Sequence, residues 1–156
     1  MDLADLAYTN APLNLHVDNP YRLPMPGYQL LHCLIAADTG GESLVADGWR
    51  AAEILREEDR EAFDILREVK TRFQYQSEDT DLCTFLPCIS TKLDDPDGDV
   101  NSVVYSSRLD FAPLLSADKL DVFYKARQTF HRILHSEESA FQTKLQVRTP
   151  PLPSSV

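Results

Sequence analysis

Short runs with strand character, each followed by a turn signal, constrain the fold of this chain more than any other feature of its sequence. Residues 28–35 form an apolar run of strand length, which predicts a strand buried on both faces of a sheet. Residues 72–75 alternate polar with aromatic side chains, as a half-exposed strand does. Because few helices separate the runs, we expect a mainly β fold with flanking helices, of the sandwich or barrel kind. The other strand-like runs are residues 43–46, 85–93, 100–106 and 141–147.

Three helices are expected between these strands. Asp47 and Asp59 can each cap a helix, and Ser116 begins the longest one, which runs to about His135. Each helix has an apolar face at helical spacing, with its charged residues on the opposite, solvated face. The residues expected on the apolar faces are Trp49, Ala52 and Leu55, then Phe63, Leu66 and Val69, then Leu120, Phe123, Ala126, Phe130, Ile133 and Leu134.

The strongest chemical signal is His16 followed by Asp18. Residues two apart project from the same side of an extended backbone, so this imidazole and carboxylate are expected to converge. Such a pair suits a metal ion, and non-haem Fe(II) oxygenases combine a close His and acid with one distant His. A hydrogen-bonded or solvated pair is the alternative interpretation. Residues 19–27 are rich in proline, which predicts a loop directly after the pair.

Other candidate metal sites have weaker support in the sequence. His131 and His135 lie four residues apart and can share a helix face, but Arg132 stands where a zinc pair of this kind has Glu. Two surface histidines are therefore expected. Residues 94–99 form an acidic hairpin turn that lacks the ligand series of a calcium loop. His32, inside the apolar run, is expected in the core.

Length and charge narrow the classes of function. A chain of 156 residues is long enough for one domain with its own core. Its 15 basic and 25 acidic residues give a net charge of -10, which repels phosphate backbones and anionic lipids, so neither nucleic acid nor a membrane is an expected partner. The acidic first residues argue against a targeting peptide and favour a cytoplasmic protein. The three cysteines predict free thiols rather than a disulfide framework.

Several short motifs follow one another near the start of the chain: LAYT at 6–9, HVDNPYR at 16–22, PGYQLLHC at 26–33 and GGES at 40–43. In this order and spacing, the chain resembles the gamma-butyrobetaine dioxygenase branch of the TauD/TfdA family, from about residue 6 to residue 145. The resemblance implies a partial double-stranded β-helix, or jelly roll. It also implies that Fe(II), 2-oxoglutarate and O2 are used.

The resemblance further implies roles for individual residues. His16 and Asp18 correspond to the near His and the carboxylate of the iron triad. Ser43 corresponds to the hydroxyl group that assists 2-oxoglutarate binding, and Leu31 corresponds to a residue lining the same pocket. The metal and co-substrate would carry the hydroxylation of an unactivated C–H bond, while protein groups orient and tune the metal.

On the substrate side, the resemblance implies that Tyr8 helps to enclose a trimethylammonium group, with a packing role as the alternative. A quaternary ammonium donates no hydrogen bond and is held by aromatic ring faces, an interaction worth roughly 2 kcal/mol when desolvated. Asn19 and Ser106 are the other candidate substrate residues, and Ser106 lies where relatives usually carry Asn. The expected small-molecule substrate is gamma-butyrobetaine, which would yield L-carnitine, with trimethyllysine as the nearby alternative.

Residues 146–156 depart from the resemblance. They form a Pro- and Ser-rich tail where the family carries a distal His ligand and an Arg that binds 2-oxoglutarate. We therefore divide the chain into an incomplete dioxygenase domain, residues 1–145, and a divergent tail, and expect the chain alone to be inactive. The alternative is a non-catalytic remnant that pairs with another copy, a relative or another protein through an exposed sheet edge. A zinc hydrolase is a third hypothesis, disfavoured because no general base or third ligand is placed.

Overall fold

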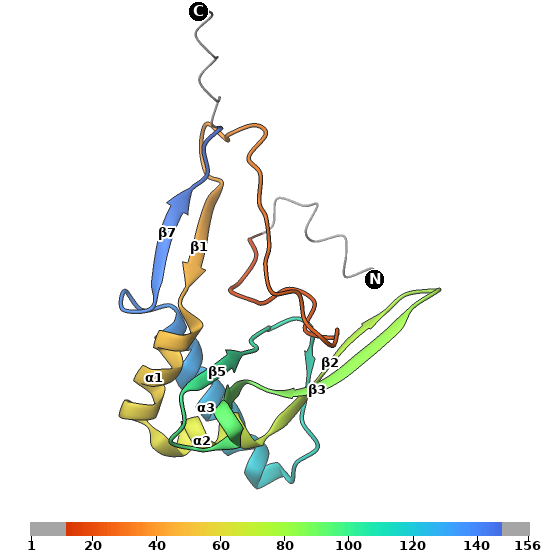
Figure 1. The fold of residues 1–156 in the computed structure, drawn as a ribbon, viewed down its shortest axis with the longest axis vertical. Coiled ribbons are helices and arrows are strands. Elements are labelled where there is room, and N and C mark those ends of the chain that lie inside the picture. Colours follow the sequence, from red (N-terminus) through yellow and green to blue (C-terminus); the bar gives the residue numbers. More distant parts are fainter. Residues whose placement is uncertain (1–11, 148–156) are drawn as a thin grey trace, which may run out of the picture.

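The computed structural model describes residues 12–147, in which helices and short strands alternate along the chain (Figure 1). No helix of this described part is both long and apolar enough to cross a membrane. The helices are α1 (Gly48–Glu58), α2 (Arg60–Glu68) and α3 (Ala117–Leu134), with a 3-10 turn, η2 (Lys92–Asp94). The strands are β1 (Glu42–Ala46), β2 (Lys70–Gln76), β3 (Asp81–Pro87), β4 (Ile89–Thr91), β5 (Val100–Val103), β6 (Asp110–Phe111) and β7 (Ala140–Lys144).

The three helices form where the sequence predicts them, because their start signals are local. Asp47 caps α1 by accepting a hydrogen bond from the Arg50 backbone N–H at 2.9 Å. Asp59 caps α2 in the same way, accepting from the Ala62 N–H at 3.0 Å. Ser116 stands at the N-cap of α3. The starts of α1 and α2 are therefore set by side chains that satisfy otherwise unpaired N–H groups, whereas Ser116 makes no such side-chain bond.

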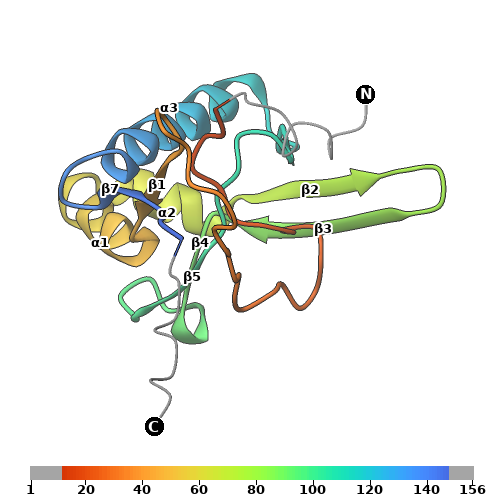
Figure 2. The same ribbon diagram turned by 90° about the horizontal axis from the view of Figure 1, so that it is seen from above.

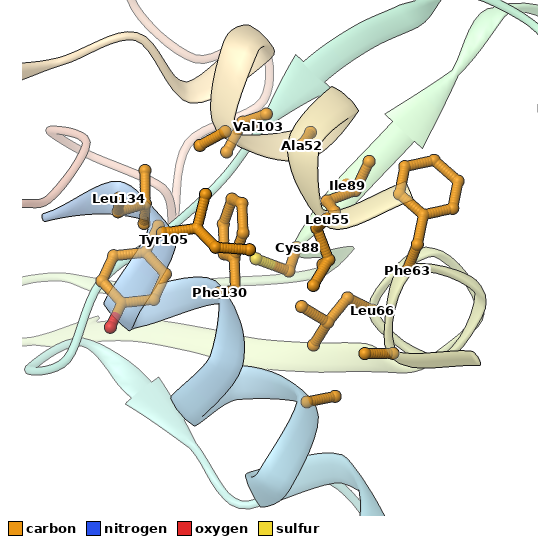
Figure 3. Packing of buried hydrophobic residues seen from close by; sticks show 14 of the residues in the cluster. Ala52, Leu55, Phe63, Leu66, Cys88, Ile89, Val103, Tyr105, Phe130 and Leu134 are labelled. Carbon is orange, nitrogen blue, oxygen red and sulfur yellow. The ribbon is translucent and has the colours of Figure 1, made fainter. Parts of the chain in front are cut away.

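The hydrophobic core lies where the three helices pack against one another and against β4 and β5 (Figure 3). One predicted core residue is wrong: Trp49 is 52% exposed. The buried face of α1 is centred on Ala51 and Leu55, and at 100° per residue Trp49 lies on the far side of the helix. The remaining buried residues of this core are Ala52, Ile54, Ala62, Phe63, Leu66, Cys88, Ile89, Val100, Val103, Tyr105, Phe123, Ala126, Phe130, Ile133 and Leu134.

The strands form three small antiparallel sheets, ordered β1–β7, β3–β2–β6 and β4–β5. The β1–β7 ribbon projects away from the helices, and the β2–β3 hairpin extends to one side of them (Figures 1 and 2). The predicted runs 43–46 and 72–75 lie inside β1 and β2, whereas residues 85–93 are divided between β3, β4 and η2. The described residues therefore form a mixed helix-and-sheet structure rather than a mainly β one, and a jelly roll is not evident among them.

The predicted strand at residues 28–35 is wrong. This run has no regular structure, and its large side chains are exposed, with Leu30 97% and Ile35 89% accessible. His32, expected in the core, is exposed as well. An apolar run becomes a buried strand only when neighbouring strands and helices cover it, and no strand within residues 12–147 pairs with this segment.

Candidate metal centre

His16 and Asp18 lie in a loop near the start of the described chain, and their side chains converge as their spacing predicts. His16 Nε2 is 3.3 Å from Asp18 Oδ1. The two side chains are 36% and 44% exposed, so solvent or a small ligand can reach both. The geometry therefore places one nitrogen and one oxygen donor together, while their role as metal ligands stays a prediction.

The backbone orients the His16 ring. Its Nδ1 is 2.7 Å from the carbonyl oxygen of Asn14, which can only accept a hydrogen bond, so Nδ1 carries the proton. In the neutral ring, the Nε2 lone pair then faces the carboxylate of Asp18. Two electron-pair donors this close are suited to sharing one cation.

Asp18 is oriented by a residue that the sequence analysis did not assign to the site. The Gln29 side-chain amide donates a hydrogen bond to Asp18 Oδ2, which leaves Oδ1 directed toward His16. Hydrogen bonds of this kind commonly fix the carboxylates of metal sites. The available signal was the presence of an amide side chain within the otherwise apolar run at 28–35.

The loop that carries the pair is attached to the folded part of the chain by two hydrogen bonds. The Val17 N–H donates to the Tyr105 carbonyl oxygen at 2.9 Å, just beyond the end of β5. The Thr84 hydroxyl, in β3, donates to the Pro20 carbonyl oxygen at 2.7 Å. Asn19 adopts a φ of 52°, a left-handed conformation that Asn tolerates better than most residues, and this turns the chain between the two attachments.

Asn19 adjoins the pair in the chain, and its side chain is held by an aromatic group. The Tyr21 hydroxyl donates to Asn19 Oδ1 at 2.6 Å. The Tyr21 ring in turn stacks on Tyr75 of β2, with 5.2 Å between the ring centroids. Among the described residues only the oxygen of the Asn19 side chain is engaged, so its N–H groups can donate to a ligand.

The assignment of Leu31 and Ser43 to 2-oxoglutarate stays a prediction. Leu31 is 69% exposed. Ser43 is half-buried in β1, opposite Thr143 of β7. Within residues 12–147, no hydrogen bond or ion pair joins either residue to His16. Tyr8 lies outside the described residues.

Ser106 is fully buried beside a charged pair that the sequence analysis missed. Arg127 of α3 donates through Nη2 to the Ser106 carbonyl oxygen at 3.0 Å and contacts Asp110 Oδ2 at 2.6 Å. Burial raises the pKa of Asp110, and the neighbouring Arg127 offsets part of this effect. Ser106 Oγ accepts from the backbone N–H groups of Arg108 and Leu109, so its predicted substrate role rests on the remaining hydroxyl hydrogen.

The position of Arg127 could have been noticed in the sequence. It lies on the apolar face of α3, four residues after Phe123 and three before Phe130, where a charged residue requires a buried partner. The sequence near Arg127 does not identify this partner, because Asp110 lies in β6, before the N-terminus of the helix. Arg127 and Asp110 hold the segment between β5 and β6, the segment to which the loop with His16 is attached.

In the part of the chain that the structure describes, no third ligand joins the pair. Residues 12–147 contain no group of three or more His, Cys, Asp or Glu side chains arranged to hold a metal ion. His131 and His135 lie instead beside each other on α3, with ring centroids 4.1 Å apart. Among the described residues, His16 and Asp18 therefore form a two-donor pair, and metal binding by this pair stays a prediction.

Comparison with known families gives one match that covers almost the whole chain. The family model described as taurine catabolism dioxygenase TauD, TfdA family matches residues 1–148. This range includes every residue considered above as a metal, co-substrate or substrate group.

Individual proteins similar to this chain are dioxygenases. Dioxygenase str8 of Strobilurus tenacellus is 34% identical over 142 residues, which is 91% of this chain and 32% of that protein. The gamma-butyrobetaine dioxygenase of Homo sapiens is 30% identical over 148 residues, 93% of this chain and 38% of that protein. The mitochondrial trimethyllysine dioxygenase of Homo sapiens is 38% identical over 71 residues, 46% of this chain and 17% of that protein. The chain spans about a third of the length of the first two relatives.

Proposed function

Because the chain belongs to the TauD/TfdA family of dioxygenases, we propose that His16 and Asp18 are two protein ligands of Fe(II) in a 2-oxoglutarate-dependent dioxygenase. The observation that carries the proposal is the convergence of His16 Nε2 and Asp18 Oδ1, with His16 Nδ1 held by a backbone carbonyl. An imidazole nitrogen and a carboxylate oxygen are donors that non-haem Fe(II) sites use, so the residues present fit the metal.

The chain's own residues orient these donors. When bound, the metal, 2-oxoglutarate and O2 supply the oxidising power for hydroxylation of a C–H bond. The Asn14 carbonyl group holds the His16 proton on Nδ1 and keeps Nε2 available, and Gln29 keeps one oxygen of Asp18 turned toward His16. Loss of either contact would leave the donor in place but free to rotate.

The co-substrate and substrate groups form a second part of the proposal. Leu31 and Ser43 are assigned to 2-oxoglutarate, and Tyr8, Asn19 and Ser106 to a trimethylammonium compound. Gamma-butyrobetaine is the proposed substrate and carnitine biosynthesis the proposed process, which the similarity to gamma-butyrobetaine dioxygenases supports. Trimethyllysine is the alternative substrate.

The proposal also divides the chain into two parts. Residues 1–145 are assigned to part of a jelly-roll dioxygenase domain, and residues 146–156 to a divergent tail. Since His16 and Asp18 provide only two donors, and the described residues provide no third beside them, we expect this chain alone to turn over no substrate.

Metal binding by the purified full chain tests the proposal. Anaerobic titration with Fe(II) should show binding that is about tenfold or more weaker in His16→Ala, since a ligand is lost. His32→Ala is the matched control, because it removes an exposed histidine outside the pair. Equal Fe(II) affinity in His16→Ala and the parent chain would overturn the ligand assignment. Succinate formation with gamma-butyrobetaine that disappears in His16→Ala would instead show that the expected inactivity is wrong.

A second candidate function is a non-catalytic module that binds a second protein chain. The observation that favours it is the exposure of the apolar run at 28–35, where Tyr28, Leu30 and Ile35 are 96%, 97% and 89% accessible. Contiguous exposed apolar side chains commonly mark interaction sites. Two results together would favour the binding module over the dioxygenase: self-association that depends on this run, and an Fe(II) affinity that is unchanged in His16→Ala.

A further inference from the structure

The last turns of α3 bring two histidines together on one exposed face. His131 and His135 are four residues apart, which places them one helical turn from each other on the same side. Their ring centroids are 4.1 Å apart, with an angle of 42° between the ring planes. Both side chains are open to solvent, so an ion can reach the space between the rings.

The His135 ring is fixed with one nitrogen lone pair free. Its Nδ1 is 2.8 Å from the backbone carbonyl oxygen of His131. A carbonyl oxygen can only accept, so Nδ1 carries the proton and the neutral ring keeps an unprotonated Nε2. A backbone carbonyl on the second ring nitrogen is the arrangement that commonly orients histidine ligands in metal sites.

The His131 ring is fixed by a different group. Its Nδ1 is 2.9 Å from the hydroxyl oxygen of Tyr105. Tyr105 is only 7% exposed, and its ring packs edge-to-face on Phe130 at 5.9 Å, so the hydroxyl has a defined position. Figure 3 shows this hydroxyl pointing away from the core cluster. When the hydroxyl accepts the Nδ1 proton, the Nε2 lone pair of His131 is free as well.

We propose that the Nε2 atoms of His131 and His135 together bind one divalent transition-metal ion of the nitrogen-preferring class, such as Zn²⁺, Ni²⁺ or Cu²⁺. Imidazole suits these ions, whereas Ca²⁺ and Mg²⁺ prefer oxygen donors. Because the described residues offer no third His, Cys, Asp or Glu ligand there, water completes the coordination. The absence of a Glu beside His131 argues against hydrolysis at this site. The bound ion would instead act structurally, by cross-linking two side chains at the C-terminal end of α3.

This site is separate from the proposed iron site. His16 and Asp18 lie in the loop held by the Tyr105 carbonyl oxygen and the Thr84 hydroxyl, whereas His131 and His135 lie on α3, and within residues 12–147 the four side chains do not form one metal-binding group. The bound ion would stabilise the C-terminal end of α3, where His135 is the C-cap and the chain continues toward β7. An ion bound only by the folded chain stabilises that chain in proportion to the logarithm of its concentration above Kd.

Calorimetric titration with Zn²⁺ tests the proposal on the full chain carrying His16→Ala, so that the other site is disabled. One Zn²⁺ per chain should bind, and His131→Ala and His135→Gln should each weaken binding by about tenfold or more. His32→Ala in the same background should leave the affinity unchanged. Tyr105→Phe, which keeps the ring but removes the hydroxyl, should weaken binding by less than either ligand change.

The melting temperature gives a second readout. Zn²⁺ should raise the melting temperature of the His16→Ala chain and should not raise that of the chain that also carries His135→Gln. Because His135 is exposed, its substitution is compatible with folding, which circular dichroism checks. Zn²⁺ affinity that is unchanged in His135→Gln and in His131→Ala would overturn the proposal. So would the absence of Zn²⁺ binding in the His16→Ala chain, and either result would leave the iron-site proposal untouched.

Discussion

Arg127 is a buried charged side chain that holds the segment next to the candidate site. It is 9% exposed and holds Asp110 and the Ser106 carbonyl group, while its Nη1 has no partner among the described residues. Arg127→Met should lower the free energy of unfolding by about 3–5 kcal/mol, because the Asp110 carboxylate is left buried without its cation. Urea denaturation measures this loss. Arg127→Met combined with Asp110→Leu should recover part of the stability, since no unpaired charge remains.

Lys92 provides a matched control for that experiment. Lys92 Nζ and Asp99 Oδ2 are 2.7 Å apart, almost the same separation as in the buried pair, but both side chains are solvated. Lys92→Met should therefore shift the urea midpoint little, because exposed ion pairs contribute weakly. Equal losses of stability in Lys92→Met and Arg127→Met would contradict the assignment of Arg127 as the buried, structurally important charge.

Cys88 should be the least reactive of the three thiols. It is 2% exposed, and burial raises the pKa of its thiol to about 12, although the nearby Arg127 acts in the opposite direction. The nucleophilic thiolate is therefore scarce at neutral pH, whereas Cys83 is exposed. An aromatic disulfide reagent should label Cys83 in the native chain and label Cys88 only after denaturation. Rapid native labelling of a Cys33→Ser, Cys83→Ser chain would show that Cys88 is accessible.

At the level of elements, Asp59 joins two helices. Its backbone N–H donates to Leu55 O at 2.8 Å, which ends α1, and its carboxylate accepts from Ala62 N–H, which begins α2. Asp59→Ala should cost about 1 kcal/mol of stability, since an N-cap is lost, whereas Asp59→Asn should cost much less. Thermal denaturation monitored by far-UV circular dichroism measures the difference. A loss in Asp59→Asn as large as that in Asp59→Ala would point to charge rather than capping.

His131, near the end of α3, should make the stability of the chain depend on pH. Burial lowers the pKa of His131 from its ordinary 6.5, and His135 and Arg127 lower it further by repulsion. As the pH falls, the unfolded chain therefore binds a proton at His131 before the folded chain does. The contribution of His131 to the free energy of unfolding is thus fully present above pH 6.5 and is lost as the pH falls from 6.5 toward the lower pKa of the folded chain. With a chelator present, His131→Gln should lose this part of the pH dependence of the urea midpoint. An unchanged pH profile in His131→Gln would assign the effect to other groups.

The helices could be predicted from the sequence because the information that forms them is local. Asp47 and Asp59 cap their helices within three residues, and Leu55 and Leu66 recur at helical spacing. The run at 28–35 failed because hydrophobicity shows what a segment would bury, not whether a neighbouring strand is present to cover it. Trp49 failed for a different reason: at about 100° per residue, Trp49 and Leu55 lie roughly 120° apart around the helix, so they do not share its buried face.

The same distinction applies to the candidate site. The convergence of His16 and Asp18 agrees with the prediction from their separation of two residues, which is local information. The partners that orient the pair are distant in sequence: Gln29 is 11 residues from Asp18, and the Tyr105 carbonyl group is contributed by the end of β5. Such contacts are properties of the folded chain, and a single sequence does not specify them.

For the whole molecule, the exposed run at 28–35 has a consequence for association. Leu30, Leu34 and Ile35 are 97%, 75% and 89% accessible, which places apolar side chains together in water along one segment. The chain should therefore self-associate with increasing concentration. The double substitution Leu30→Asp, Ile35→Asp should shift the equilibrium toward monomer. It should not lower the melting temperature, because neither side chain is buried. Sedimentation velocity over a concentration series measures this. Leu93→Asp is the control, since Leu93 is 100% exposed but lies in η2, away from the run. Equal weakening of association by Leu93→Asp would show that general surface hydrophobicity, and not the run at 28–35, drives association. A parent chain that stays monomeric at every concentration would remove the main support for the binding-module alternative.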